Sequence, residues 1–597
     1  MNHALIYLIA LCLVAPLAAY VWAAMSTPRS KVNTSAGYFI AYRQVGTAPF
    51  ANSSLAYAFQ VATLFPFLYW GMQGQILPAV VNAIAWGVGI FAFRQCLDPI
   101  LARLGGGRQP KTLHGLLGDA HSSPAVQRTA AGVTICGMLG VALAEAYWGM
   151  QVVKVIVPED TPAYYAIVFG SLLFVLAYIW YGGTWGSMKT DMLQLVISYL
   201  GFTTIFLFAL SSMIRAGTMP PKESLIISTL MWALGAGAVA IRVTKRIRPI
   251  SQMEPTADTE NERTVLPAEQ AAPDDIWSKL TVGLSGATLL AIAALVLSFF
   301  VLFTFSVRTG TLSVLANPGD PTWKGILALA VLGVLFQFVD MSAWQRLQAL
   351  GGSAPEAKDH ARWGLLLFSV ESPFSWIMCA ALGMLLMTTV PELASAPDKA
   401  GPLAAYPRLL IATGSYLNIS MAIVFMVAVM GVMLSTIDSA ILAAMYAFVA
   451  DVQGCEFRTE SAIAATPSDK AQDRQDLLSG KKAAFSMITG VSAGIVALGW
   501  ALQSPDKLIG IMVGFYGAML SLFPAVVMML RQWRWPSGAF INAGMRCGVI
   551  VALAFTIWGV FDSDKAWYAV LAAPTVAAVI PLVSAGFAGL FGTTHSA

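Results

Sequence analysis

The sequence predicts an all-α, polytopic membrane protein with about fifteen transmembrane helices. Hydrophobic residues make up 57% of the 597 residues and charged residues only 11%, which is far from the composition of a soluble domain. Apolar runs near the roughly 20 residues that a helix needs to cross a bilayer recur along the whole chain. We therefore expect most of these helices to lie in a lipid bilayer, so the bilayer is one expected partner of the protein.

The predicted spans follow from hydropathy and from the positions of charged residues. Two charged segments, 248–275 and 451–482, interrupt the apolar pattern and are predicted to be cytoplasmic linkers. The spans cover residues 4–24, 50–70, 76–96, 127–156, 162–183, 190–213, 223–243, 281–307, 323–345, 363–388, 411–449, 483–503, 507–530, 541–561 and 566–591.

The distribution of basic residues predicts the orientation of the chain. No Lys or Arg precedes the first span, whereas Arg29, Lys31 and Arg43 follow it. The first span therefore reads as a retained anchor with the N-terminus outside, and fifteen spans then place the C-terminus in the cytoplasm. We expect a multi-pass protein of the plasma membrane, specifically a bacterial inner membrane. The net charge of +4 follows from this topology, so no nucleic-acid partner is expected.

The order of the spans indicates internal symmetry. Residues 50–213 and 323–530 each hold five spans with an unusually long third one, a pattern typical of a 5+5 inverted repeat. The predicted divisions are an anchor helix and linker (1–49), a first repeat (50–213), an inserted helix pair with an acidic linker (214–322), a second repeat (323–530) and a two-helix extension (531–597).

Several classes of protein are excluded by what the sequence lacks. The six cysteines show no CxxC spacing, which argues against an iron–sulfur site. We expect all five histidines to lie in loops or tails at the surface, which argues against an intramembrane metalloenzyme. No phosphate-binding loop of the type G-x-x-x-x-G-K-[ST] is present, which argues against a nucleotide-driven pump. The chain is therefore not expected to be an enzyme, and an ion gradient is its expected source of energy.

The run 431–451 places polar side chains inside an apolar span. Ser435, Asp438 and Ser439 share one helix face, with Thr436 beside them. A carboxylate there costs roughly 2.5 to 3.5 kcal/mol unless it has a partner, so it predicts a functional site. Oxygen ligands suit a hard cation such as Na⁺, or a proton relay. The alternative is structural, with hydroxyls bonded to the backbone and Asp438 paired with a neighbouring helix.

Other polar residues interrupt the first span of each block and its neighbours. The segment 60–63 precedes Pro66, which predicts either a helix break that exposes backbone carbonyls or an ordinary proline kink. In the second block, an amide and an acid follow Phe336 within the apolar run. The remaining buried polar residues are candidates for a binding site or for interhelical hydrogen bonds: Asn82, Glu145, Gln337, Asp340 and Glu371.

Five motifs occur in the order in which they occur in a known family. They are GYFIAYRQVG (37–46), KTLHGLLGD (111–119), WYGGTWGSMKTDMLQ (180–194), WQRLQAL (344–350) and LSTIDSA (434–440). Over roughly residues 36 to 530 the chain thus resembles the sodium/solute symporter family of LeuT-type secondary transporters. The sequence departs from the family at Tyr42 and Pro66, where glycine is usual, and at the extra spans 223–243 and 281–307.

The resemblance implies two cation sites between the first and eighth core helices. The first, for Na⁺, takes backbone carbonyls and hydroxyls from Ala56, Phe59, Val432, Ser435 and Thr436. The second takes Asp191 together with Ser435, Asp438 and Ser439, and two carboxylates this close favour either a second cation or a proton. Na⁺ is the expected coupling ion and H⁺ the alternative.

The resemblance also implies a substrate site beside the sodium. Its residues are Gln60, Thr63, Asn82, Phe336, Gln337, Asp340 and Glu371. Because no buried Arg or Lys is expected among them, a small neutral, zwitterionic or cationic organic solute fits better than an anion. The predicted function is cation-coupled symport by alternating access; the alternative is a transporter-like sensor that binds a solute and signals to a partner.

Overall fold

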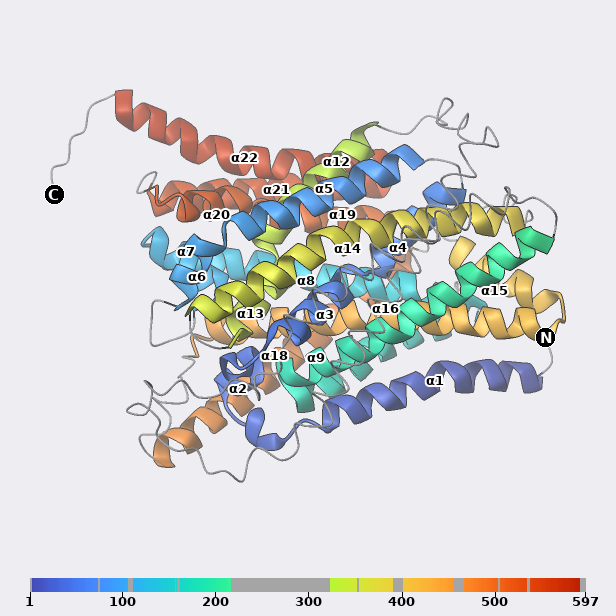
Figure 1. The fold of residues 1–597 in the computed structure, drawn as a ribbon. Helices are drawn as coiled ribbons and strands as arrows, with labels where there is room; N and C mark the ends of the chain where they lie inside the picture. The colour runs from blue at the N-terminus through green and yellow to red at the C-terminus, as the bar shows by residue number, and fades with distance from the viewer. Residues whose placement is uncertain are drawn as a thin grey trace.

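The computed structural model describes residues 3–72, 76–105, 111–155, 157, 161–215, 323–351, 354–389, 401–455, 467–502, 505–533 and 537–590. In these ranges the chain is almost entirely helical, and the helices run side by side in one bundle (Figure 1). Seven of the described helices are long and apolar enough to cross a membrane. The number is nine if two bent helix pairs, in residues 47–72 and 78–104, each count as one span. The predicted total of fifteen is not reached among them, and the predicted spans 223–243 and 281–307 lie outside the described residues.

The first part of the chain forms the helices that were predicted for the first block, preceded by an anchor helix. Their bounds are α1 His3–Met25, η1 Arg29–Lys31, α2 Ser35–Ile40, η2 Ala41–Arg43, α3 Thr47–Ala58, α4 Val61–Met72, α5 Ile76–Gln95, α6 Leu97–Gly105, α7 Leu113–Ala120, α8 Pro124–Gly149, η3 Met150–Val155 and α9 Pro162–Arg215. The two predicted spans 162–183 and 190–213 both lie in α9, where Gly183 adopts a φ of +50° and interrupts the helical backbone.

The second part contains the helices of the second block and the C-terminal pair. Their bounds are α12 Trp323–Val339, α13 Met341–Ala349, α14 Ala354–Thr389, α15 Gly401–Ala412, α16 Tyr416–Ala447, η9 Phe448–Val452, α18 Pro467–Leu502, α19 Pro505–Leu520, α20 Phe523–Leu530, α21 Gly538–Phe561 and α22 Ser563–Leu590. The predicted span 411–449 is wrong at its start, because α15 ends at Ala412 and α16 begins at Tyr416.

Two helices that face each other in the bundle are broken. The chain bends by 54° between α3 and α4, where Phe59 and Gln60 leave the helical conformation. The break therefore lies at the start of the predicted segment 60–63, and Pro66 sits inside α4. A second break separates α12 from α13 at Asp340, which has an extended backbone conformation. Broken helices expose backbone N–H and C=O groups in the middle of the bundle.

The core of the bundle is built around α16, which packs against α8, α9 and α3. Residues 428–447 of this helix are all buried. The pair α21 and α22 packs along one edge, on α19 and α12, whereas α1 lies along the opposite edge beside α9 (Figure 1). Ser435, Thr436, Asp438 and Ser439 of α16 are therefore enclosed by other helices rather than exposed to lipid.

Tyr42, which stands where the family motif has glycine, lies in a turn with an unusual backbone conformation. Ala41, Tyr42 and Arg43 all have a positive φ, between 49° and 58°. Glycine adopts this left-handed conformation without strain, whereas a residue with a side chain costs roughly 1 to 2 kcal/mol. The Tyr42 hydroxyl contacts the Thr34 hydroxyl, and the Arg43 guanidinium donates to the Leu104 carbonyl at 2.8 Å, which holds the turn in place.

Candidate functional site

The hydroxyl groups of α16 lie next to the broken end of α3. The Thr436 hydroxyl oxygen is 3.5 Å from the Tyr57 carbonyl oxygen and equally far from that of Val432 in its own helix. Ala56 belongs to the last turn of α3, and Phe59 directly follows that helix. The Phe59 ring stacks on Tyr199 of α9, with 5.5 Å between ring centroids. The structure thus brings together the two segments from which a sodium site was predicted.

Two buried oxygen atoms near this point lack a hydrogen bond of normal geometry among the described residues. They are Asp191 Oδ1 on α9 and Ser435 Oγ on α16, whose side chains are neighbours. The other carboxylate oxygen of Asp191 accepts a hydrogen bond from the Ser53 hydroxyl at 2.5 Å. Buried polar atoms are normally paired, because an unpaired one costs about 1 to 3 kcal/mol. A carboxylate and a hydroxyl oxygen left over in this way fit a hard cation.

Asp438 has a different environment from Asp191. Its Oδ2 accepts hydrogen bonds from the Tyr178 hydroxyl at 2.8 Å and the Thr190 hydroxyl at 2.9 Å. Its Oδ1 accepts from Ser187 at 3.1 Å and from Ser439 at 3.3 Å. The carboxylate is thus paired with hydroxyls of α9, which was the structural alternative for Asp438. Tyr178, Ser187 and Thr190 were not predicted, although the last two lie in the motif 180–194.

A buried arginine corrects the expected charge of the region. Arg346 on α13 is 6% exposed, so the expectation that no Arg or Lys is buried near the substrate site is wrong. Its guanidinium donates to the hydroxyls of Ser53 at 2.9 Å, Ser342 at 3.0 Å and Ser439 at 2.7 Å. Arg346 lies in the motif 344–350, but it falls just past the predicted span 323–345 and was not among the predicted site residues.

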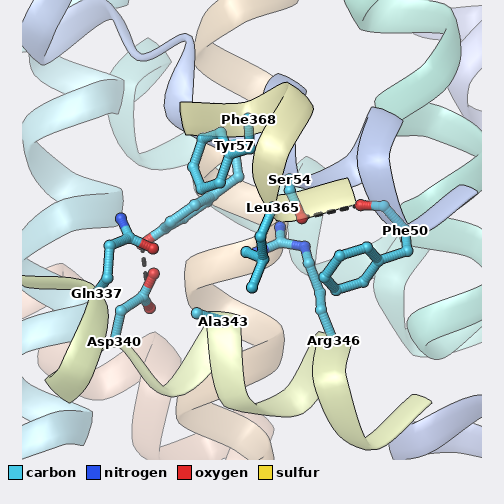
Figure 2. A pocket seen from close by; sticks show the side chains of 9 residues that line it. All are labelled: Phe50, Ser54, Tyr57, Gln337, Asp340, Ala343, Arg346, Leu365 and Phe368. Carbon is cyan, nitrogen blue, oxygen red and sulfur yellow. Dashed lines mark hydrogen bonds between the residues drawn. The ribbon is translucent and has the colours of Figure 1, made fainter. Parts of the chain in front are cut away.

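A small cavity lies beside the second helix break, between α3, α13 and α14. Figure 2 shows Asp340, Gln337 and Tyr57 on one side of it and Arg346 with Phe50 on the other. Asp340 caps α13, because its Oδ1 accepts from the Ser342 backbone N–H at 2.9 Å. Asp340 Oδ2 and Gln337 Nε2 have no partner among the described residues. This small cavity is therefore lined by charged, polar and aromatic side chains.

The other predicted substrate residues do not line this cavity. Thr63 follows the first break, with its hydroxyl 3.5 Å from Gln60 Oε1, and Gln60 Nε2 has no partner among the described residues. The Asn82 amide donates to the Pro78 carbonyl of its own helix at 2.8 Å. Phe336 stacks on Trp86, with 5.7 Å between centroids. Glu371 accepts a hydrogen bond from the Ser375 hydroxyl one turn later in α14.

Two histidines are buried, which contradicts the expectation that all five lie at the surface. His114 is fully buried, with Nδ1 2.8 Å from Asp451 Oδ2 and Nε2 2.9 Å from the Thr134 hydroxyl. Burial lowers the pKa of His121, whose Nε2 lies 3.2 Å from the Ala525 carbonyl. Both residues were assigned to a loop because that segment is short, but it forms α7, which packs on α8.

Comparison with known proteins gives one informative likeness. No family model and no curated protein sequence matches the chain. Among solved structures, a Na⁺-coupled sialic acid symporter, in a substrate-bound outward-open state with a novel Na⁺ site, matches with a TM-score of 0.58. The two are 13% identical, and the match covers 97% of this chain and 98% of the other. The likeness shows the fold: the chain shares the polytopic helical fold of that protein.

Proposed function

We propose that this protein is a Na⁺-coupled secondary active symporter that imports a small organic solute by alternating access. The observation that carries the proposal is the pair of unpartnered oxygens, Asp191 Oδ1 and Ser435 Oγ, inside a bundle with a transporter fold. A buried carboxylate with an open coordination position favours a cation, because the guanidinium of Arg346 reaches Asp191 only through the Ser53 hydroxyl.

The proposed sodium site lies between the end of α3 and the middle of α16. Ala56, Phe59 and Val432 would contribute backbone carbonyls, and Ser435 and Thr436 hydroxyl oxygens. Asp191 with Ser435 forms the proposed second cation site, next to the hydroxyls that hold Asp438 and Ser439. When bound, Na⁺ supplies positive charge to these oxygens and the free energy of its gradient. Because the ligands come from two helices, occupancy of the site holds α3 and α16 together.

The two helix breaks support a mechanism of alternating access. Discontinuous helices at mid-membrane are where secondary transporters of this kind bind ion and substrate. We propose that residues 50–213 and 323–530 form the two inverted repeats, and that the first and sixth core helices, α3–α4 and α12–α13, rock against the rest. The proposed location is a bacterial inner membrane, with the N-terminus outside and the C-terminus in the cytoplasm.

A thermal-shift titration of the purified protein tests the cation site. NaCl is compared with KCl at constant ionic strength, on the wild type and on Ser435→Ala. A ligand that binds only the folded state stabilises it by about 2.7 kcal/mol at a hundredfold excess over Kd, so we expect a sodium-specific rise in Tm that Ser435→Ala loses. Ser420→Ala, on an exposed position of the same helix, is the matched control and keeps the rise.

Two results would decide against this proposal. Equal stabilisation by Na⁺ and K⁺ would remove the sodium site, and stabilisation by acid alone would favour H⁺ as the coupling ion. If sodium stabilises the protein, uptake into proteoliposomes under an inward Na⁺ gradient separates transport from sensing, since a sensor binds a solute without accumulating it.

A further inference from the structure

Helix α9 contains a break that the proposed mechanism does not use. Gly183 has a φ of +50° and interrupts the helical backbone. A Cβ atom at this position would lie 2.5 Å from the Tyr38 carbonyl oxygen, so only glycine lets α2 approach the break this closely. Directly after the break, the Thr184 hydroxyl donates to the Phe39 carbonyl of α2 at 2.7 Å. The break in α9 is therefore packed against α2.

Carbonyl groups just before the break accept hydrogen bonds from two other segments. The Tyr38 hydroxyl of α2 donates to the Ile179 carbonyl at 2.8 Å. The Lys481 ammonium of α18 donates to the Trp180 carbonyl at 2.6 Å. The last carbonyls of a helix have no partner within it and carry roughly half a negative charge, so an ammonium group is favourable there. Lys481 therefore caps the first half of α9.

Aromatic rings hold Lys481 in this position. The residue is 8% exposed, and its Nζ lies 4.0 Å from the centroid of the Tyr38 ring and 4.6 Å from that of the Trp180 ring. Burial lowers its pKa to about 7, with no charged group of the described chain acting against it. The rings and the Trp180 carbonyl thus offset part of the cost of burying an ammonium group.

The start of α18 also holds α2 through a carboxylate. Asp473 Oδ2 accepts a hydrogen bond at 3.1 Å from the backbone N–H of Ser35, the first residue of α2. Helix α18 packs on both α2 and α9, and the three lie near one another in the bundle (Figure 1). Residues 467–482 were predicted to be part of a linker, but they belong to α18 and support the break.

The break lies between the groups of α9 that surround the proposed second cation site. Before the break, Tyr178 donates to Asp438 Oδ2 at 2.8 Å. After it, Ser187 donates to Asp438 Oδ1 at 3.1 Å and Thr190 to Oδ2 at 2.9 Å. Asp191, the acid of the proposed site, directly follows Thr190. Because Asp438 accepts from both halves of α9, the angle between these halves determines how the two carboxylates lie.

We propose that Lys481 is a positioning residue for the proposed second cation site. By holding the Trp180 carbonyl it fixes the angle between the halves of α9, and with it the geometry of Asp191 and Asp438. The inference rests on the proposed transport function and adds a regulatory input to it, because Lys481 belongs to the segment 467–482 outside the predicted span. Release of this segment from α2 and α9 weakens cation binding.

Sodium titrations of the full-length protein by thermal shift test the proposal. They are run at about pH 6, below the pKa of Lys481, so that its amino group is charged. Lys481→Met removes the ammonium group and keeps an unbranched side chain, whereas Lys481→Arg keeps the charge. Lys482→Met, at the exposed neighbouring position, is the matched control. Tyr38→Phe keeps its ring beside Lys481 and loses the hydroxyl bonded to Ile179.

We expect Lys481→Met to weaken sodium binding about 10-fold. Loss of a group that orients metal ligands typically costs roughly 10- to 100-fold in affinity, and Lys481 acts through the backbone of α9. Lys481→Arg should restore most of the affinity, Lys482→Met should bind like the wild type, and Tyr38→Phe should weaken binding in the same direction. Hydrogen exchange in residues 176–191, recorded without sodium, should become faster in Lys481→Met and Tyr38→Phe.

Three results would decide against the inference. An unchanged sodium affinity in Lys481→Met would overturn it even if the Tm without sodium falls, because a merely structural role changes stability alone. If Lys481→Met does not fold, unchanged sodium binding in Tyr38→Phe would overturn it instead. A wild type that does not respond to NaCl refutes the proposed sodium site, and unchanged exchange in Lys481→Met would show separately that Lys481 does not hold the break.

Discussion

Arg346 is linked to three buried aspartates, Asp191, Asp340 and Asp438, through hydroxyl groups. Its three guanidinium nitrogens donate to Ser53, Ser342 and Ser439, which come from α3, α13 and α16. Its guanidinium carbon also lies 4.7 Å from the centroid of the Tyr57 ring. Because the planar guanidinium donates hydrogen bonds to several acceptors at fixed angles, neither Lys nor a neutral amide can replace all of these contacts.

Replacement of Arg346 should therefore destabilise the protein. Removal of one partner of a buried charge pair typically costs about 3 to 5 kcal/mol, so Arg346→Gln should lower the Tm strongly in the absence of sodium. Arg346→Lys keeps the charge and should lie between Arg346→Gln and the wild type. Thermal unfolding of the purified variants measures this, with the exposed Arg362→Gln as control. Equal stability of Arg346→Gln and the wild type would show that the guanidinium does not compensate the acids.

Individual buried residues also show where sequence reasoning ends. The positions of Ser435, Asp438 and Asp191 in apolar runs predicted that these side chains are buried, and they are. Which groups they contact depends on how α9, α13 and α16 pack, and hydropathy along one helix holds no information about its partner. The hydroxyls around Asp438 and the guanidinium beside Ser439 were therefore not predicted.

At the scale of elements, α20 ends in a conformation that its sequence does not favour. Gln532 has a φ of +57°, and its N–H donates to the Met529 carbonyl at 3.1 Å, while the Trp533 N–H donates to the Met528 carbonyl at 3.0 Å. This pair of bonds is the Schellman motif, in which glycine usually occupies the left-handed position. The exposed Gln532 side chain is thus the strained residue of this turn.

Substitution of Gln532 by glycine should stabilise the protein. Relief of the left-handed strain should gain about 1 kcal/mol, because a side chain there costs roughly 1 to 2 kcal/mol. Arg531→Gly, one residue earlier at a helical φ of −83°, should destabilise the protein, since glycine in a helical position costs about 0.5 to 1 kcal/mol. Unfolding curves of both variants provide the comparison, and a loss of stability in Gln532→Gly would contradict the strain.

Helix boundaries were easier to predict than breaks. Length and hydropathy located most of the described helices, because a bilayer-spanning helix needs a long apolar run whatever its neighbours are. The break at Asp340 lacks a proline or glycine signal, and the break near Gln60 lies before Pro66 rather than at it. The break at Gln60 is stabilised by Glu145 of α8, and the break at Asp340 by the helix cap that Asp340 forms. Hydropathy contains no information about either contact.

At the scale of the whole molecule, α13 is attached to several segments at one end of the bundle. Val45 and Leu350 form a single bridge, in which the Val45 N–H donates to the Ala349 carbonyl at 3.0 Å. Gln348 donates to the Lys111 carbonyl and accepts from the Tyr446 hydroxyl, the latter at 2.7 Å. In the proposed mechanism α13 moves, so these contacts must break when this end of the bundle opens.

Removal of the Gln348 side chain should favour that opening. Gln348→Ala loses both contacts, so hydrogen exchange should become faster across 341–351 and 111–120, and sodium should slow it again if the cation site holds the closed state. Exchange in α1, which packs on α9 at the edge of the bundle, serves as the internal control (Figure 1). Unchanged exchange in α13 would show that Gln348 does not hold this end closed.

The hydrogen bond between Glu145 and Val61 joins a helix of the static part, α8, to the helix proposed to rock, α4. Every cycle that tilts α4 must stretch or break this bond and form it again. In the proposed mechanism the strength of this bond therefore contributes to the activation energy of each turnover.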